Sequence, residues 1–196
     1  MTLPKKRDIL YLLTVRQDSF QRSAIAMEFL NLIKERYSCK KFDGRPIDES
    51  VLTAILEAGR LAPTTKNAQA QRVYVLTSPK ALAALDSITP CRYGAPVVLA
   101  VAYDRNSVFH YPGDTRDSGA EDASIVGVHM MLAAKNVGVD SCWVNFFDPE
   151  KLKKALTLPE NEDLVLLLDL GYRGEGGGPL LNHTSRKPLV ETVRVL

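Results

Sequence analysis

Two basic side chains and one hydroxyl alternate along a short stretch of the chain, as Arg36, Ser38 and Lys40. In an extended backbone, side chains two residues apart point to the same side, so these three would converge on one spot. Guanidinium, hydroxyl and ammonium groups are together a suitable set of donors for a phosphate. A solvated basic segment would show the same pattern, so the stretch alone leaves both interpretations open.

A loop rich in hydroxyl and amide side chains follows a predicted helix over residues 48–61. Pro63 ends that helix, because the residue before a proline is driven out of the α region. The polar side chains of the loop can donate and accept hydrogen bonds with the polar edge of a ring. The loop residues concerned are Pro63, Thr64, Thr65, Asn67 and Gln69.

Two further segments complete the pattern. Residues 138–145, which end in Val144 and Asn145, follow a long helix of small residues, and Arg186 near the C-terminus offers another cation. In this order and spacing, the four segments resemble the FMN-dependent nitroreductase family, from about Met27 to the C-terminus. Each motif is short, and their order, with helices and strands between them, makes the resemblance specific.

The resemblance implies an FMN site that is shared between two chains. Arg36, Ser38 and Lys40 would hold the phosphate and ribityl chain of FMN, joined by Arg186. The family often has arginine where this chain has Lys40, so a point charge replaces a bidentate fork. A loop of the partner subunit would approach the same flavin through Pro63, Thr64, Thr65 and Asn67.

The same resemblance implies that other residues contact the flavin ring. Val144 and Asn145 would lie against the isoalloxazine, with the backbone amide of Asn145 near the ring nitrogen that takes the hydride. Asn67 and Gln69 are candidate hydrogen-bond partners of the pyrimidine edge. Residues 69–71 read Gln-Ala-Gln where many relatives have Gln-Pro-Trp, which leaves the substrate side less defined.

The resemblance also implies a fold and a reaction. The fold would be α+β, with a central mixed β-sheet flanked by helices, in an intertwined homodimer with two flavin sites. NAD(P)H would donate a hydride to FMN and leave, and a nitroaromatic, quinone or similar small acceptor would take its place. The cofactor supplies this chemistry, so no catalytic acid is assigned.

Three other functions stay open. Relatives with the same fold carry out reductive dehalogenation, flavin fragmentation or dehydrogenation of peptide-derived heterocycles. A non-catalytic FMN-binding dimer would be yellow but would not be bleached by NAD(P)H. A structural or interaction protein with a decayed site would be colourless. The presence of Arg36, Ser38, Lys40, Asn67 and Arg186 argues against decay.

The composition is that of an ordinary soluble domain. At 196 residues, with 45% hydrophobic and 24% charged residues, the chain suits one domain with a substantial core. A net charge of +2 gives no sign of a nucleic-acid binder. Residues 1–41 carry nine basic and four acidic side chains, which fits either a basic arm for membrane or nucleic acid or a phosphate site with a solubilising tail. We favour the second interpretation.

The cysteines form no recognised motif. Cys39, Cys91 and Cys142 lack C-x-x-C spacing, which argues against a disulfide framework or a zinc site and suits a reducing cytoplasm. A redox role for Cys39 or Cys142 stays open beside the simpler role of small buried filler. No run of about 18 apolar residues is present, so we predict a cytoplasmic protein without a membrane helix.

The first 26 residues precede the family-like pattern. Their basic start and short apolar run resemble a signal peptide, but no small-residue cleavage site follows. They are a native extension, the product of an upstream start or an artificial addition. The predicted FMN-binding domain is therefore 27–196.

Helical and strand patterns alternate along this domain without a repeat or a linker. Helices are predicted over 28–36, 48–61, 79–87, 121–137 and 149–156. Strands are predicted over 72–77, 96–103, 141–146 and 164–171, and the tail 189–196 is expected to be extended. The glycine-rich residues 171–178 lack the G-x-G-x-x-G order and are interpreted as a plain loop.

Overall fold

A computed structural model describes residues 29–196, in which helices and strands alternate as predicted. The proposed extension, residues 1–26, lies outside the described residues. The strands are β1 (Gln71–Leu76), β2 (Val97–Asp104), β3 (Asp140–Val144) and β4 (Glu162–Gly171). The helices are α2 (Phe29–Glu35), α3 (Glu49–Arg60), α4 (Pro79–Asp86), α5 (Gly119–Asn136), α6 (Pro149–Leu156) and α7 (Leu189–Thr192), with short 3-10 helices η2 (Thr65–Asn67) and η3 (Arg105–Ser107).

The four strands form one antiparallel sheet in the order β1-β2-β4-β3. β2 and β4 take the centre because they are the long apolar runs, buried from Val97 to Ala102 and from Leu166 to Gly171. The resemblance implied a mixed sheet. Among the described strands every pairing is antiparallel, and the parallel component is an isolated bridge between Ser38 and Ser141 on β3.

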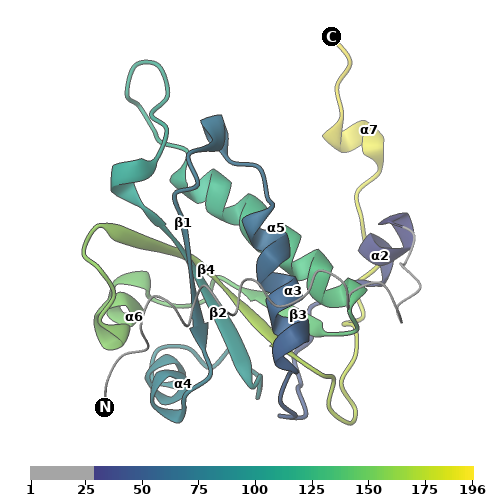
Figure 1. The fold of residues 1–196 in the computed structure, drawn as a ribbon. Coiled ribbons are helices and arrows are strands. Elements are labelled where there is room, and N and C mark those ends of the chain that lie inside the picture. The colour runs from purple at the N-terminus through teal and green to yellow at the C-terminus, as the bar shows by residue number, and fades with distance from the viewer. Residues whose placement is uncertain (1–28) are drawn as a thin grey trace.

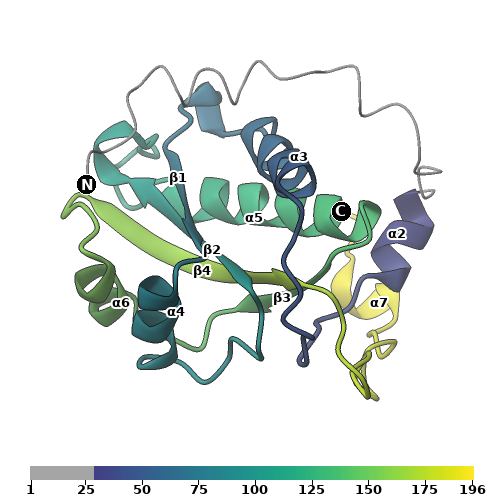
Figure 2. The same cartoon turned by 60° about the horizontal axis from the view of Figure 1, so that its bottom comes forward.

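Helices cover both faces of the sheet (Figures 1 and 2). α3 and α5 pack on one face and α4 and α6 on the other, which makes the molecule an α+β sandwich of three layers. The core on the α3/α5 face includes Ile55, Leu99, Val126, Met130, Leu166 and Leu168. The core on the α4/α6 face includes Leu85, Val98, Ala100, Cys142, Leu152 and Leu167.

The small residues predicted to let the long helix pack closely do so at Gly127. A Cβ atom there would lie 2.9 Å from Cζ3 of Trp143 and 3.0 Å from Cδ2 of Leu166, closer than real Cβ contacts come. The absent side chain lets α5 approach the sheet beside the end of β3. None of the described helices is long and apolar enough to cross a lipid bilayer.

The tail departs from the extended conformation that its β-prone sequence predicted. Leu189–Thr192 forms one helical turn, α7, after Pro188 with a φ of −58°. The Val193 amide donates to the Leu189 carbonyl at 2.8 Å, so local hydrogen bonds satisfy the backbone. A β-prone segment needs a neighbouring strand to become one, and the described part of this chain offers the tail none.

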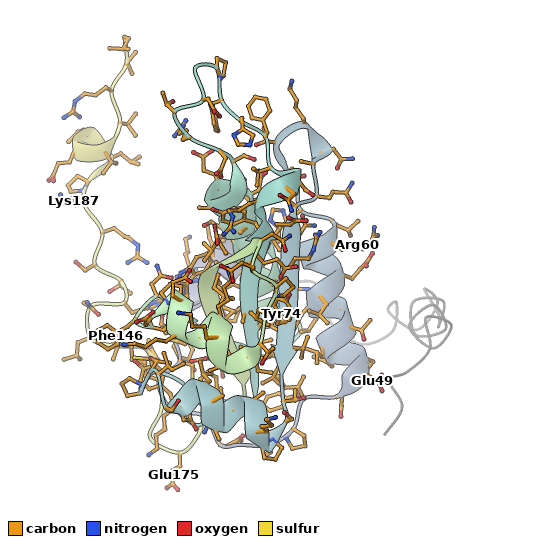
Figure 3. The ribbon with its side chains drawn as sticks, turned by 90° about the vertical axis from the view of Figure 1, so that its left-hand side faces the viewer. Glu49, Arg60, Tyr74, Phe146, Glu175 and Lys187 are labelled. Carbon is orange, nitrogen blue, oxygen red and sulfur yellow. The ribbon has the colours of Figure 1, made fainter. Side chains whose placement is uncertain are left out.

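Residues 179–196, which we call the C-terminal arm, leave the body of the molecule (Figures 1 and 3). The start of the arm is anchored beside α2, where His183 Nε2 lies 3.1 Å from the Lys34 carbonyl and the His183 ring packs edge-on against Tyr37. Farther out, the arm exposes large apolar side chains. These are Leu180, Leu181, Leu189, Val190, Val193, Val195 and Leu196.

Candidate functional site

The backbone around Cys39 is fixed against the edge of β3. Ser38 forms the parallel bridge with Ser141, and the Cys39 amide donates to the Ser141 carbonyl at 2.9 Å. Cys39 is fully buried. Because side chains alternate in extended backbone, Ser38 and Lys40 point away from the side that buries Cys39.

Ser38 and Lys40 line a hollow of about 260 Å³ beside the end of β3, which we call the β3 pocket. Val144 and Asn145 line it too, so predicted site residues from two distant segments meet there. The full lining is Ser38, Lys40, Cys91, Tyr93, Cys142, Trp143, Val144, Asn145 and Phe146. A larger hollow of about 370 Å³ contains none of the predicted site residues. A cation and a hydroxyl set among aromatic and aliphatic walls suit a flat ring with an anionic chain.

The loop after α4 supplies a wall that the sequence did not reveal. Thr89 Oγ1 donates to the Phe146 carbonyl at 2.6 Å, which ties this loop to the segment after β3. The Lys40 ammonium lies 5.8 Å from the centre of the Tyr93 ring, within cation–π range. Cys91 and Tyr93 stand in no motif, and long-range contacts bring them to the pocket, among them a hydrogen bond of 3.0 Å from the Phe42 amide to the Tyr93 carbonyl.

The far wall is shaped by the residues that follow Cys142. Trp143 Nε1 donates to Asn145 Oδ1 at 2.8 Å, which orients the amide of Asn145. The Phe147 amide donates to the Asn145 carbonyl at 3.0 Å and turns the chain. Phe146, labelled in Figure 3, is 73% exposed at the molecular surface. An apolar ring left open beside a polar pocket is available to a ligand.

The segments that contain Arg36 and Arg186 lie near each other although they are far apart in the sequence, because His183 Nε2 lies 3.1 Å from the Lys34 carbonyl. Burial and then the proximity of Arg186 lower the pKa of the Arg36 guanidinium. Arg186 Nη1 donates to the carbonyls of His183 and Ser185 at 2.7 and 2.6 Å. Within residues 29–196 neither guanidinium forms an ion pair with a carboxylate. Two like charges gathered without an acid are expected where an anion binds.

The polar loop that contains Asn67 and Gln69 has an unusual backbone. Lys66, Asn67 and Gln69 have φ values of 52°, 55° and 51°, in the left-handed region that residues other than glycine rarely adopt. Each such residue costs roughly 1–2 kcal/mol. The amide and hydroxyl of Thr65 donate to Asp122 Oδ1 at 2.9 and 3.1 Å and hold the loop in place.

The other contacts of this loop leave the side chains of Asn67 and Gln69 exposed to solvent. The Gln69 amide donates to Thr64 Oγ1 at 3.0 Å, and the Lys66 ammonium lies 4.9 Å from the Phe109 ring centre. Pro63, like Asn67 and Gln69, is exposed. Strained backbone that faces solvent is typical of a surface prepared for a ligand.

The loop and the β3 pocket lie at opposite edges of the sheet. Gln71, directly after the loop, pairs with Tyr103, and Tyr103 pairs with Asp163 on β4. Cys142 and Val144, which line the pocket, pair instead with Asp169 and Leu167 farther along β4. From strand spacing and rise, the loop is roughly 14 Å from the pocket across the sheet and roughly 13–20 Å from it along the strands. One chain therefore brings Ser38, Lys40, Val144 and Asn145 to the β3 pocket. Arg36 and Arg186 do not line this pocket but belong to segments that meet beside α2. The same chain keeps Pro63, Thr64, Thr65, Asn67 and Gln69 away from the pocket.

Comparison with known proteins places this geometry in context. A model of the nitroreductase family matches residues 33–90 and 90–172. The structure of a nitroreductase family protein from Clostridium difficile 630 is 33% identical, with a TM-score of 0.80 over 86% of this chain and 98% of its own. A nitroreductase with bound FMN from Bacteroides fragilis is 25% identical, with a TM-score of 0.69 over 86% of this chain and 98% of its own. A protein of Thermus thermophilus named NADH dehydrogenase is 27% identical over 194 residues, 81% of this chain and 91% of its own.

Proposed function

The chain belongs to the nitroreductase family and is an oxidoreductase, and we propose that it passes a hydride from NAD(P)H through bound FMN to a small acceptor. FMN, when bound, supplies the two-electron chemistry, so the protein has to bind, orient and shield the ring. The acceptor is a nitroaromatic, a quinone or a similar flat, electron-poor molecule. The exposed ring of Phe146 beside the β3 pocket is an apolar surface for such a molecule.

The observation that supports FMN most strongly is the pairing of Arg36 with Arg186. Two half-exposed or exposed guanidinium groups repel each other, and a bound phosphate would remove that repulsion. Ser38 and Lys40, on the pocket wall, would extend the set of donors along the ribityl chain. Val144 and Asn145 would lie against the ring, with the Asn145 amide near the atom that receives the hydride.

The site we propose is completed by a second copy of the chain. The loop with Asn67 and Gln69 is preshaped and exposed, and it lies too far from its own β3 pocket to share a flavin with it. In a homodimer the loop of the partner subunit would reach the ring edge. Large apolar side chains of the C-terminal arm are exposed in the described part of the chain. The arm is therefore suited to pack against that second copy.

The test is FMN titration of Arg36→Ala and Arg186→Ala. Each substitution should weaken binding by about 1.5–3 kcal/mol, the range for hydrogen bonds to a charged group. The matched control is Arg60→Ala, because Arg60 is exposed and paired with Glu57 at 2.5 Å, away from the pocket. Unchanged FMN affinity in both Arg36→Ala and Arg186→Ala would remove the phosphate assignment.

A further inference from the structure

The larger hollow, of about 370 Å³, lies at the start of β3, and the proposed hydride transfer does not use it. Its volume falls within the range of roughly 300–1,000 Å³ that is typical of sites for small molecules. It shares no lining residue with the β3 pocket, so it is a separate site. We call it the basic pocket, and its lining includes Tyr37, Arg45, Lys135, Asp140, Tyr172 and Arg173.

Hydrogen bonds fix the segments that form the basic pocket. Asp140, the first residue of β3, pairs with Gly171 at the end of β4, and the Arg173 amide donates to Asp140 Oδ2 at 3.2 Å. The Asp43 amide donates to the Tyr172 carbonyl at 2.9 Å and holds the chain before Arg45 against the same end of β4. The pocket is therefore built on backbone that the sheet keeps in place.

Three cations line the basic pocket, and two of them lack a partner. Arg45 has one, because its Nε donates to Asp43 Oδ2 at 2.5 Å, and its guanidinium carbon lies 4.6 Å from the centre of the Tyr172 ring. In the described chain, from residue 29 onward, the Lys135 ammonium and the Arg173 guanidinium form no ion pair and no side-chain hydrogen bond. Two such cations that line one hollow are suited to hold an anion.

Asp140 places one carboxylate in the same hollow as these cations. Burial, and then the charge of Asp140, raise the pKa of Tyr37 to about 12, so the Tyr37 hydroxyl stays protonated and remains a donor at neutral pH. A carboxylate accepts hydrogen bonds and donates none. A ligand that contacts both the cations and Asp140 therefore needs hydroxyl groups beside its anionic group, which a bare inorganic anion does not offer.

We propose that the basic pocket binds a sugar phosphate, that is, a phosphate monoester of a molecule with several hydroxyl groups. The Arg173 guanidinium and the Lys135 ammonium hold the phosphate. Asp140 accepts hydrogen bonds from hydroxyl groups of the sugar, between the rings of Tyr37 and Tyr172 that line the hollow. Because this site is separate from the β3 pocket, the sugar phosphate neither requires FMN nor competes with it.

The test is isothermal titration calorimetry of the full chain with ribose 5-phosphate and glucose 6-phosphate, with and without an excess of FMN. We expect one molecule of sugar phosphate to bind per chain with an affinity that FMN does not change, and we expect no binding of free ribose or glucose. Failure of both sugar phosphates to bind would overturn the proposal. So would displacement of the sugar phosphate by FMN, because the ligand would then occupy the flavin site.

Substitutions of the two cations test where the phosphate lies. Arg173→Ala and Lys135→Ala should each weaken sugar phosphate binding about 10- to 100-fold, the range for hydrogen bonds to a charged group. Lys80→Ala is the matched control, because Lys80 is an exposed lysine of α4 that does not line the pocket. Arg36→Ala should also leave this affinity unchanged. Affinity that falls in Arg36→Ala but in neither Arg173→Ala nor Lys135→Ala would overturn the assignment.

Asp140→Asn distinguishes a sugar phosphate from a bare ion. The variant loses a negative charge beside the cations, so it should bind inorganic phosphate at least as tightly as the wild type. Its preference for a sugar phosphate over inorganic phosphate should fall about tenfold, because the acceptor of the sugar hydroxyl groups is weakened. A wild type that binds inorganic phosphate as tightly as either sugar phosphate would contradict the proposed role of Asp140 and leave only an anion site.

Discussion

Two buried carboxyl groups show how differently the two halves of the proposed site are built. Asp122, under the polar loop, is 2% exposed and accepts three hydrogen bonds, from the amide and hydroxyl of Thr65 and from Ser118 Oγ at 2.8 Å. Asp169, behind the β3 pocket, is 1% exposed and has an oxygen without any partner.

The two carboxyl groups therefore have different roles. A buried acid surrounded by donors fixes the backbone that supplies them, so Asp122 is an anchor for the strained loop. A buried acid without donors keeps its proton, so Asp169 fixes no neighbouring backbone in the way that Asp122 does.

The largest change in stability is expected from Asp169→Asn, and its size should depend on pH. The pKa of this carboxyl is raised from 3.8 to about 9, so the folded protein holds a proton that the unfolded chain releases. The stability this proton gives is complete below about pH 4 and is lost as the pH rises to about 9. Asp169→Asn should abolish this decline and exceed the wild type in stability at neutral pH.

Urea unfolding of both proteins from pH 4 to pH 9 measures this difference. Asp48→Asn is the control, because Asp48 is exposed and its side chain caps no helix amide. Parallel stability curves for the wild type and Asp169→Asn would mean that Asp169 is ionised in the folded protein.

Asp122→Ala should be the next most damaging change. It removes the acceptor of three hydrogen bonds and leaves the Thr65 amide and the Ser118 hydroxyl without an acceptor for their protons. The free energy of unfolding should fall by about 3 kcal/mol. Asp122→Asn retains one acceptor oxygen and should lose roughly half as much. A loss below about 1 kcal/mol in Asp122→Ala would show that the loop does not depend on this anchor.

Gly127→Ala should lower the free energy of unfolding by about 2 kcal/mol, through overpacking on the pocket side of the molecule. The added Cβ would lie 2.9 Å from the Trp143 ring, and that ring holds the Asn145 amide through Nε1. Both stability and FMN affinity should therefore fall. Ser124→Ala, at a partly exposed position of the same helix, serves as the control. Lower stability with unchanged FMN affinity would mean that the ring shift does not reach the cofactor.

The smallest expected effect is a gain in stability. Gln69 has a φ of 51°, which glycine adopts without strain. Gln69→Gly should raise the free energy of unfolding by about 0.5 kcal/mol, after the entropy cost of glycine is subtracted. Gln69→Ala keeps the strain and is the matched control. If both variants unfold alike, the loop stores no strain at this position.

Much of the fold is predictable from local signals. The helix at 149–156 was predicted with its true bounds. In the structure Asp148 accepts a hydrogen bond from the Lys151 amide and Pro149 occupies the first turn, so local residues fix where this helix begins. The run 96–103 was recognised as a buried strand because it is apolar without interruption. Alternation in extended backbone predicted that Arg36, Ser38 and Lys40 share a side. Ser38 and Lys40 line the β3 pocket, but Arg36 does not, because its amide still donates to the Leu32 carbonyl at the end of α2.

The features that depend on distant contacts were not predictable. Cys91 and Tyr93 reach the pocket through the bond from Thr89 to the Phe146 carbonyl, and no local pattern signals such a bond. The pairing of Asp169 with Cys142 depends on the strand register between β3 and β4. The tail was wrongly predicted as extended, since α7 forms from hydrogen bonds between neighbouring residues where no partner strand is present.

Sedimentation velocity followed at the visible flavin band tests the central claim most directly. The account predicts that FMN absorbance sediments with a dimer of the 21.7 kDa chain, and that dilute FMN-free protein shifts toward monomer. A ligand bound only by the dimer must also stabilise the dimer. NAD(P)H added without oxygen should then bleach the sedimenting band. Flavin held tightly by a monomer, or a band that NAD(P)H does not bleach, would contradict the shared site or the proposed reaction, respectively.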